Sequence, residues 1–315
     1  MEPLPRGANP RRWSLLWEIG LHLAGSSSSA NDMLIGVGSG AGARFDAQLR
    51  MSTGSPQLAR SVVAGDLDLA MVNPSAILTQ AYRGIGAYAE PLPVRIVAVF
   101  PSWDRFVFML HQRTGMQTLD QVREERFPLH LSVREDPCHS TRALVDQIFA
   151  LHGFTIDDLE EWGGSLITCR LPRDRVQGLQ DGSIDAVADE GLGQPLWFEH
   201  ALRTGFIPIG FQDIIVEGLE DLGWQPKPIP AGSYDGLADE CFALDYGGWP
   251  LYTRASLPDE LAYGVVGAID ARSAYVAWED PFEGMGPLGS VTESTPMGVP
   301  LHPGARRWYE EHGVI

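Results

Sequence analysis

Cysteine and basic residues are scarce in this sequence, and long apolar runs are missing. Three cysteines (Cys138, Cys169 and Cys241) stand far apart without a CxxC pair, which excludes a disulfide framework and a cysteine-rich zinc site, while a single bridge stays open. The sequence has 23 Lys and Arg residues but 41 Asp and Glu residues. The resulting net charge of −18 repels phosphate, so nucleic acid is not an expected partner. No stretch approaches the roughly 20 consecutive apolar residues that cross a bilayer, so we expect a soluble mature chain without direct membrane insertion.

The usual motifs for metals and nucleotides are also missing. The eight histidines form no HExxH pattern, so no metal site is expected. The glycine-rich stretch "GVGSGAG" lacks the Lys-Ser/Thr ending of a phosphate-binding loop, and it is not a GxGxxG motif. The sequence therefore gives no reason to expect a cofactor.

The length and composition indicate an ordinary globular protein with two lobes. At 315 residues the chain exceeds one typical domain, and its hydrophobic fraction of 44% supports a sizeable core. Charged residues make up 20%, which argues against disorder. We therefore expect two globular units.

A helix–strand–helix pattern occurs twice. "SPQLARSVVAG", "DLDLAMVN" and "PSAILTQAYRG" form the first copy, and "DRVQGLQDG", "SIDAVAD" and "GQPLWFEHALRTG" form the second. The glycines expected to end the first helix of each copy, Gly65 and Gly182, are 182 − 65 = 117 positions apart. This spacing is too long for a solenoid repeat and instead favours two similar α/β lobes.

A second repeated pattern predicts where the chain passes between the lobes. "RFVFMLHQRTGMQTLDQVR" and "GGWPLYTRASLPDELAYGVVGAI" each combine a strand, a turn and a helix, with Arg113 and Arg254 at matching places. Strands that alternate with helices predict an α/β fold with mixed or largely parallel sheets. We predict lobe one at 1–110 and 245–315, with lobe two, 111–244, inserted between them.

Three loops that follow predicted strands are the candidate binding residues. They carry Asn73 and Ser75, Ser140 and Thr141, and Asp189 and Glu190. In open α/β sheets ligands gather where strands end and helices begin, so these loops meet at the binding site if the lobes face each other. Each residue alone also fits a plain helix cap, as Ser75 does, or a solvated charge. The prediction of a binding site therefore depends on the three loops lying close together in the fold.

An enzymatic alternative comes from Cys138 and His139. A thiol at a helix start has a lowered pKa, which would suit a nucleophile in a cytoplasmic ligand sensor or an enzyme-like member of the same fold. Adjacent residues usually point in different directions, however, and the sequence supplies no third orienting group. We therefore expect no enzyme and no catalytic residues.

The N-terminal segment has two interpretations. "NPRRWSLLWEIGLHLAGSSSSAN" is similar to a twin-arginine export signal cut after Ala30, although Glu18 and His22 interrupt its apolar run. The apolar spacing from Arg12 to Ala24 is typical of an amphipathic helix, which we favour. An export signal upstream of this chain is then needed if the protein is secreted.

Several segments together resemble the TAXI-type solute receptors of TRAP transporters. "STGSPQLARSVVAGDLDLAMVN", "FPSWDRFVFMLHQRTGMQTLDQVR" and "HSTRALVDQIFALHGFT" are similar to internal segments of that family. "IPAGSYDGL" is close to its Ile-Pro-Ala-Gly-Thr-Tyr segment, and "PLHPGARRWYEEHGVI" nearly reproduces its closing motif. The resemblance runs from about Ser52 to the end, and it departs at "PCHST", where the family has Gly-Ser-Gly-Thr.

The resemblance implies a periplasmic receptor, most simply a monomer, that closes two hinged lobes on a small organic anion such as an amino acid or a carboxylate. It also implies delivery of that solute to TRAP membrane subunits. It adds Tyr234 as a ligand residue, and Trp13 if the N-terminal helix replaces the family's first loop; "IGVGSGAG" is the competing loop. For the tail it implies a terminal helix, Ala305 to Glu311, docked through Trp308 and Tyr309.

Overall fold

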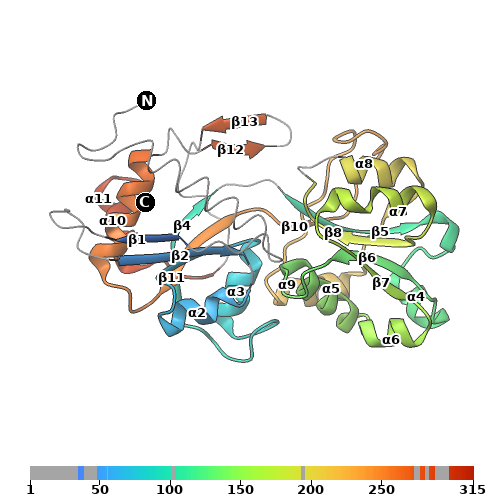
Figure 1. Ribbon diagram of the computed structural model, residues 1–315, viewed down its shortest axis with the longest axis horizontal. Coiled ribbons are helices and arrows are strands. Elements are labelled where there is room, and N and C mark those ends of the chain that lie inside the picture. Colours follow the sequence, from blue (N-terminus) through green and yellow to red (C-terminus); the bar gives the residue numbers. More distant parts are fainter. Residues whose placement is uncertain are drawn as a thin grey trace.

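The computed structural model describes residues 35–38, 48–54, 56–100, 104–192, 196–272, 277–280, 284–287 and 298–315. These residues form two α/β lobes that lie side by side (Figure 1). The predicted two-lobe α/β fold is therefore confirmed. The predicted N-terminal helix, with Trp13, lies outside the described residues.

Lobe one is built on a sheet of five strands. Their order is β1 (Ile35–Gly38), β2 (Gln48–Gly54), β3 (Leu69–Val72), β11 (Trp249–Arg254) and β4 (Val94–Phe100). One face packs against α2 (Leu58–Ala64) and α3 (Ser75–Arg83), and the other against α10 (Asp259–Arg272) and α11 (Pro303–Glu311) (Figure 1). Neighbouring strand residues serve opposite faces: Ile96 joins the α2 and α3 side, whereas Val97 joins the α10 and α11 side.

Lobe two has a six-stranded sheet that is also covered on both faces. The strand order is β10 (Leu244–Asp245), β5 (Arg105–His111), β8 (Ala186–Asp189), β6 (His130–Arg134) and β7 (Ser165–Cys169), with β9 (Phe206–Pro208) also pairing with β5. The helices on one face are α7 (Val176–Asp181) and α8 (Leu196–Arg203), and those on the other are α4 (Leu119–Glu125), α5 (Ser140–Leu151), α6 (Ile156–Glu161) and α9 (Asp213–Asp221) (Figure 1). A separate hairpin consists of β12 (Ala277–Asp280) and β13 (Gly284–Pro287).

Both sheets are mixed, which is the first of the two predicted arrangements, and the central pairs are antiparallel. Strand β5 runs antiparallel to β8, and β11 runs antiparallel to β3 and β4. Helical crossovers within a lobe make strands such as β6 and β8 parallel. By contrast, the chain reaches β5 and β11 directly from the other lobe. Strand β5 therefore begins where β8 ends, and β11 begins where β3 ends.

Strand pairing also bears on the lobe boundaries, which the sequence predicts at 110/111 and 244/245. Strand β4 belongs to the sheet of lobe one and β5 to that of lobe two, so the first crossing lies between Phe100 and Arg105. The return crossing lies between β10 and β11, after Asp245. We keep two crossings as the proposed division and place β5 with lobe two.

The repeated pattern in the sequence corresponds to a repeated ion pair. In lobe one the Arg254 guanidinium contacts the Asp68 carboxylate at 3.2 Å and also donates to the Leu67 carbonyl. In lobe two Arg113 contacts Asp185 at 2.9 Å. The aspartates are 185 − 68 = 117 positions apart, the same interval as that between the two helix-ending glycines. In each lobe an arginine in a turn thus forms an ion pair with the aspartate that precedes a central strand.

The terminal helix α11 docks on lobe one as predicted. Its N-cap is His302, whose ring Nδ1 accepts a hydrogen bond from the Gly304 amide at 3.2 Å. Trp308 and Tyr309 are buried, and the Tyr309 hydroxyl donates to the Val97 carbonyl at 2.9 Å. The C-terminal motif is therefore a structural element of lobe one.

Close packing at the start of α11 predicts an effect of a single methyl group. A Cβ at Gly304 would lie 2.0 Å from the carbonyl oxygen of Asp259, so we expect Gly304→Ala to lower the free energy of unfolding by about 1–3 kcal/mol. The matched control is Gly264→Ala inside α10, where nothing lies within 4 Å, and we expect it to stabilise the protein by about 0.5–1 kcal/mol. Urea unfolding measures both variants; equal effects would contradict the close contact.

Candidate functional site

The ends of strands from the two lobes meet at the lobe interface. Asn73 follows β3 of lobe one, and Ser140 begins α5 of lobe two. The Ser140 hydroxyl donates to the Asn73 carbonyl at 2.8 Å, and it lies 2.5 Å from the hydroxyl of Tyr246 in the second crossing. The structure thus brings together two of the predicted loops.

Ser75 lies in the same loop as Asn73, but it is not the cap of α3. It is the first residue of the helix and is buried, while Pro74 occupies the N-cap position without a side-chain cap bond. The prediction that Ser75 caps the helix is therefore wrong. Proline favours the extended backbone conformation seen at this cap, with φ −83° and ψ 175°.

The N-terminus of α5 is capped by His139. Its Nδ1 accepts from the Thr141 amide at 3.2 Å and lies 2.9 Å from the Thr141 hydroxyl, while its Nε2 lies 3.9 Å from the Glu190 carboxylate. Burial lowers the pKa of His139, against the pull of Glu190 toward a charged ring. We therefore take the imidazole as neutral at pH 7.

The Cys138 thiol is not part of a nucleophile–base pair in the described residues. The Cys138 amide donates to the Asp136 carboxylate at 2.9 Å, and no hydrogen bond links the thiol to His139, whose Nδ1 serves Thr141. All three cysteines carry free thiols. The geometry therefore gives the enzymatic alternative no support.

Asp189, the last residue of β8, and Glu190, which follows it, lie within a network of buried charges. Asp189 is fully buried and accepts from the Arg134 Nε at 2.8 Å and from Arg175, while Glu190 accepts from the second arm of Arg134. Burial alone would raise the pKa of Asp189, but the two guanidinium groups hold it below its usual range. Two arginines and two carboxylates thus neutralise one another.

Asp104 adds a third carboxyl group to this network. It begins the segment that enters β5, and its carboxylate accepts from the amides of Gly191 and Leu192, each at 3.1 Å. Burial, followed by the neighbouring Glu190 with which it shares a hydrogen bond, raises the pKa of Asp104 well above its usual value. The Asp104 carboxyl group therefore stays protonated to a higher pH than an exposed aspartate does.

Tyr234 lies next to this network but faces the core of lobe two. Its hydroxyl donates to the Leu192 carbonyl at 3.0 Å, and its ring makes an edge contact with Phe198 at 5.1 Å between centroids. The residue thereby supports the loop that follows Glu190. Its predicted role as a ligand contact, like that of the other residues named from the sequence, stays a proposal.

Sequence reasoning missed Asp104, Arg134 and Tyr246. Arg134 closes the buried strand β6, and a charged residue at the end of an apolar run is a signal that was available in "LHLSVRED". Asp104 and Tyr246 lie in the crossings between lobes, where no local pattern marks them. Their relevance appears only when both crossings are placed beside the end of β8.

Two further observations on the described residues concern metal ions and membranes. No group of three or more His, Cys, Asp or Glu among them is arranged to bind a metal ion. In the same part of the chain, no helix has both the length and the apolar content that crossing a membrane requires.

The chain is similar to several solved binding proteins, at low sequence identity. The alkanesulfonate-binding protein SsuA from Xanthomonas axonopodis pv. citri, bound to MOPS, is 14% identical over 70% of this chain and 61% of its own, with a TM-score of 0.34. The periplasmic aliphatic sulphonate binding protein SsuA from Escherichia coli is 15% identical over 69% and 55%, with a TM-score of 0.33. An ancestral arginine-binding protein bound to arginine is 10% identical over 69% and 70%, with a TM-score of 0.33.

The chain thus matches less than two thirds of the length of either SsuA protein. A family model gives a broader match: the model described as the NMT1-like family covers residues 33–313, which is most of the sequence. The protein therefore belongs to the NMT1-like family.

Proposed function

We propose that this protein is an extracytoplasmic solute-binding receptor that holds a small organic anion of the amino acid type between its two lobes. The observation that carries this proposal is the meeting of Asn73, Ser140 and Glu190, each at a strand end or helix start, at one lobe interface. Such positions gather ligands in open α/β sheets. The function needs no covalent step, and none of the contacts of Cys138 suggests one.

The charges at the interface favour an amino acid over a simple dicarboxylate. Arg134 is already engaged, because its nitrogens contact Asp189, Glu190 and the Arg170 carbonyl. A solute carboxylate could instead bind at the N-terminus of the twelve-residue helix α5, where the helix dipole attracts anions, by replacing His139 as the partner of the Thr141 amide. The neighbouring carboxyl groups of Asp104 and Glu190 suit an ammonium group. A zwitterion satisfies both ends.

The transport partner in this proposal is a TRAP-type membrane complex. This assignment depends on the resemblance of the internal segments and the closing motif to TAXI receptors, and periplasmic location follows from the same resemblance. The test is capture of the membrane subunits by tagged receptor in detergent extracts of the native host. Recovery of an ABC-type permease instead would replace the TRAP assignment and leave the receptor proposal intact.

The role of Glu190 predicts a change in affinity that depends on the amino group of the solute. We expect amino acids, and not their 2-oxo acid analogues, to raise the melting temperature. An amino acid that binds, added at a concentration of about 100 times its Kd, stabilises the folded protein by about 2.7 kcal/mol. In calorimetry Glu190→Gln should weaken that hit by roughly 10- to 100-fold, since a charged hydrogen bond contributes about 1.5–3 kcal/mol. Glu217→Gln on the exposed side of α9 is the matched control and should bind normally.

Two outcomes would contradict this assignment of Glu190. One is tight binding of a 2-oxo acid or a dicarboxylate with no response to the amino acids. The other is an amino acid hit whose affinity is the same in Glu190→Gln and in Glu217→Gln. A flat screen on folded protein would count against the receptor proposal itself.

A further inference from the structure

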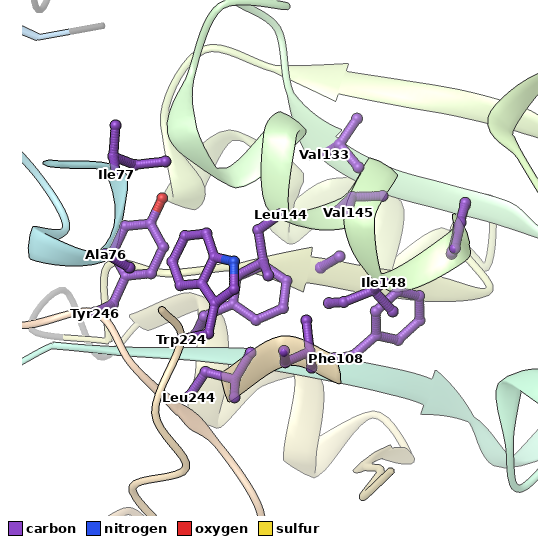
Figure 2. Close-up of a cluster of buried hydrophobic side chains, with 14 of the residues drawn as sticks. Ala76, Ile77, Phe108, Val133, Leu144, Val145, Ile148, Trp224, Leu244 and Tyr246 are labelled. Atoms are coloured by element: carbon purple, nitrogen blue, oxygen red, sulfur yellow. The ribbon is translucent and has the colours of Figure 1, made fainter. Parts of the chain in front are cut away.

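The two lobes share a buried apolar contact beside the candidate site. Helix α3 of lobe one brings Ala76 and Ile77 against Trp224, Leu144 and Tyr246, and Figure 2 shows these side chains gathered between the lobes. All five are buried, with Trp224 and Tyr246 fully so. Their cluster continues into the core of lobe two through Phe108 and Val145 (Figure 2). The apolar core therefore crosses the lobe boundary.

An amide pair forms the first polar bridge across this contact. The side chains of Gln80 on α3 and Gln147 on α5 exchange two hydrogen bonds, at 3.2 and 3.1 Å. The Gln147 oxygen also accepts from the Trp224 indole nitrogen at 2.7 Å. Gln80 is fully buried, so separating the lobes would break reciprocal bonds of a group that water does not reach in the folded protein.

A hydroxyl relay forms the second bridge. The Ser140 hydroxyl donates to the Asn73 carbonyl at 2.8 Å, so the Tyr246 hydroxyl must be the donor in the 2.5 Å bond between Tyr246 and Ser140. Burial keeps the pKa of Tyr246 far above its usual value, so that donor persists at neutral pH. The relay connects the second crossing, lobe two and lobe one.

Between the two bridges, lobe two packs closely against α3 of lobe one at Gly223. Gly223 of lobe two has φ +92°, and a Cβ there would lie 3.0 Å from the Cγ2 of Thr79 on α3. The carbonyl of Ala76 would lie 3.7 Å away. Backbone and side chain therefore touch across the boundary without room for a water layer.

From these contacts we infer that α3, α5 and Trp224 form a latch that keeps the lobes closed in the absence of solute. Ser140, Tyr246, Gln80 and Gln147 are positioning residues of this latch, and they set the separation between Asn73 and Glu190. The inference concerns the lobes alone and does not require the proposed solute. It replaces the simple expectation from the sequence that the solute drives closure.

Small-angle X-ray scattering on ligand-free protein tests the latch. The full chain is unfolded in guanidinium and refolded on a column, which removes any small molecule carried through purification. We expect the refolded protein to keep the radius of gyration of the closed structure. Ala76→Arg, which places a charged side chain beside Tyr246, should increase it, whereas Ala64→Arg on the exposed side of α2 should not.

Gln147→Ala is the milder second variant, for use if Ala76→Arg fails to fold; it removes the amide pair and should also increase the radius of gyration. The latch is overturned if refolded wild-type protein is as extended as a folded latch variant. It is equally overturned if folded Ala76→Arg or Gln147→Ala stays as compact as Ala64→Arg. Neither result depends on identifying a solute, so failure of the latch is distinct from failure of the receptor proposal.

Discussion

Replacing Asp189 with alanine is expected to lower the free energy of unfolding by about 3–5 kcal/mol, because the change leaves buried guanidinium groups without their countercharge. Asp189 is fully buried between Arg134 and Arg175, and both of its oxygens accept hydrogen bonds from them. Arg175 is also buried, with its guanidinium 4.8 Å from the centre of the Trp197 ring. Neither arginine can turn into solvent without disturbing the end of β8.

Urea unfolding followed by circular dichroism measures this effect. The matched control is Asp235→Ala, because Asp235 pairs with Arg203 at 2.7 Å on the surface, where both side chains are at least half exposed. We expect the control to cost less than about 1 kcal/mol. A loss for Asp189→Ala as small as that of the control would mean that the network does not hold the charges as described.

The second large effect is expected at Tyr309 of the terminal helix. Tyr309 is fully buried among Leu69, Val97 and Val266, so Tyr309→Ala removes a whole ring from the core between α11 and the sheet of lobe one. Truncating a buried aromatic residue costs about 3–5 kcal/mol. The melting temperature and the urea midpoint should both fall.

Tyr309→Phe distinguishes the contribution of the Tyr309 ring to stability from that of its hydroxyl. It keeps the packing and removes only the hydrogen bond to the Val97 carbonyl, so we expect a loss of about 0.5–1.5 kcal/mol. If Tyr309→Ala proved no worse than Tyr309→Phe, the ring would not be part of the core, and α11 would be a surface appendage.

Local signals in the sequence predicted much of the fold. Gly65 and Gly182 end their helices with φ +84° and +80°, as expected for residues that tolerate a left-handed backbone. The repeated helix–strand–helix pattern and the equivalence of Arg113 and Arg254 are confirmed, and so is the docked tail helix that the family resemblance implied. In each case the information lies within a short stretch or in the repetition of one.

The candidate site was less predictable, because its contacts join distant parts of the chain. Asn73 and Ser140 were predicted as neighbours from strand-end positions, yet nothing local indicated that the Ser140 hydroxyl is engaged by Tyr246, 106 residues away. Asp104 meets Glu190 only because β5 and β8 pair in antiparallel fashion, which brings the start of one strand to the end of the other. The prediction of mixed or largely parallel sheets did not say which strands are antiparallel, since pattern alone does not say from which lobe a strand arrives.

The 117-residue repeat has a consequence for the orientation of a bound molecule. Asn73 and Glu190 are themselves 190 − 73 = 117 positions apart, each directly after the central strand of its lobe. Equivalent places in the two halves thus carry an uncharged asparagine in one lobe and a glutamate in the other. A duplicated scaffold with unlike chemistry at matching points gives the interface a direction, so the proposed solute, which has two distinct ends, is expected to bind one way round and not the reverse.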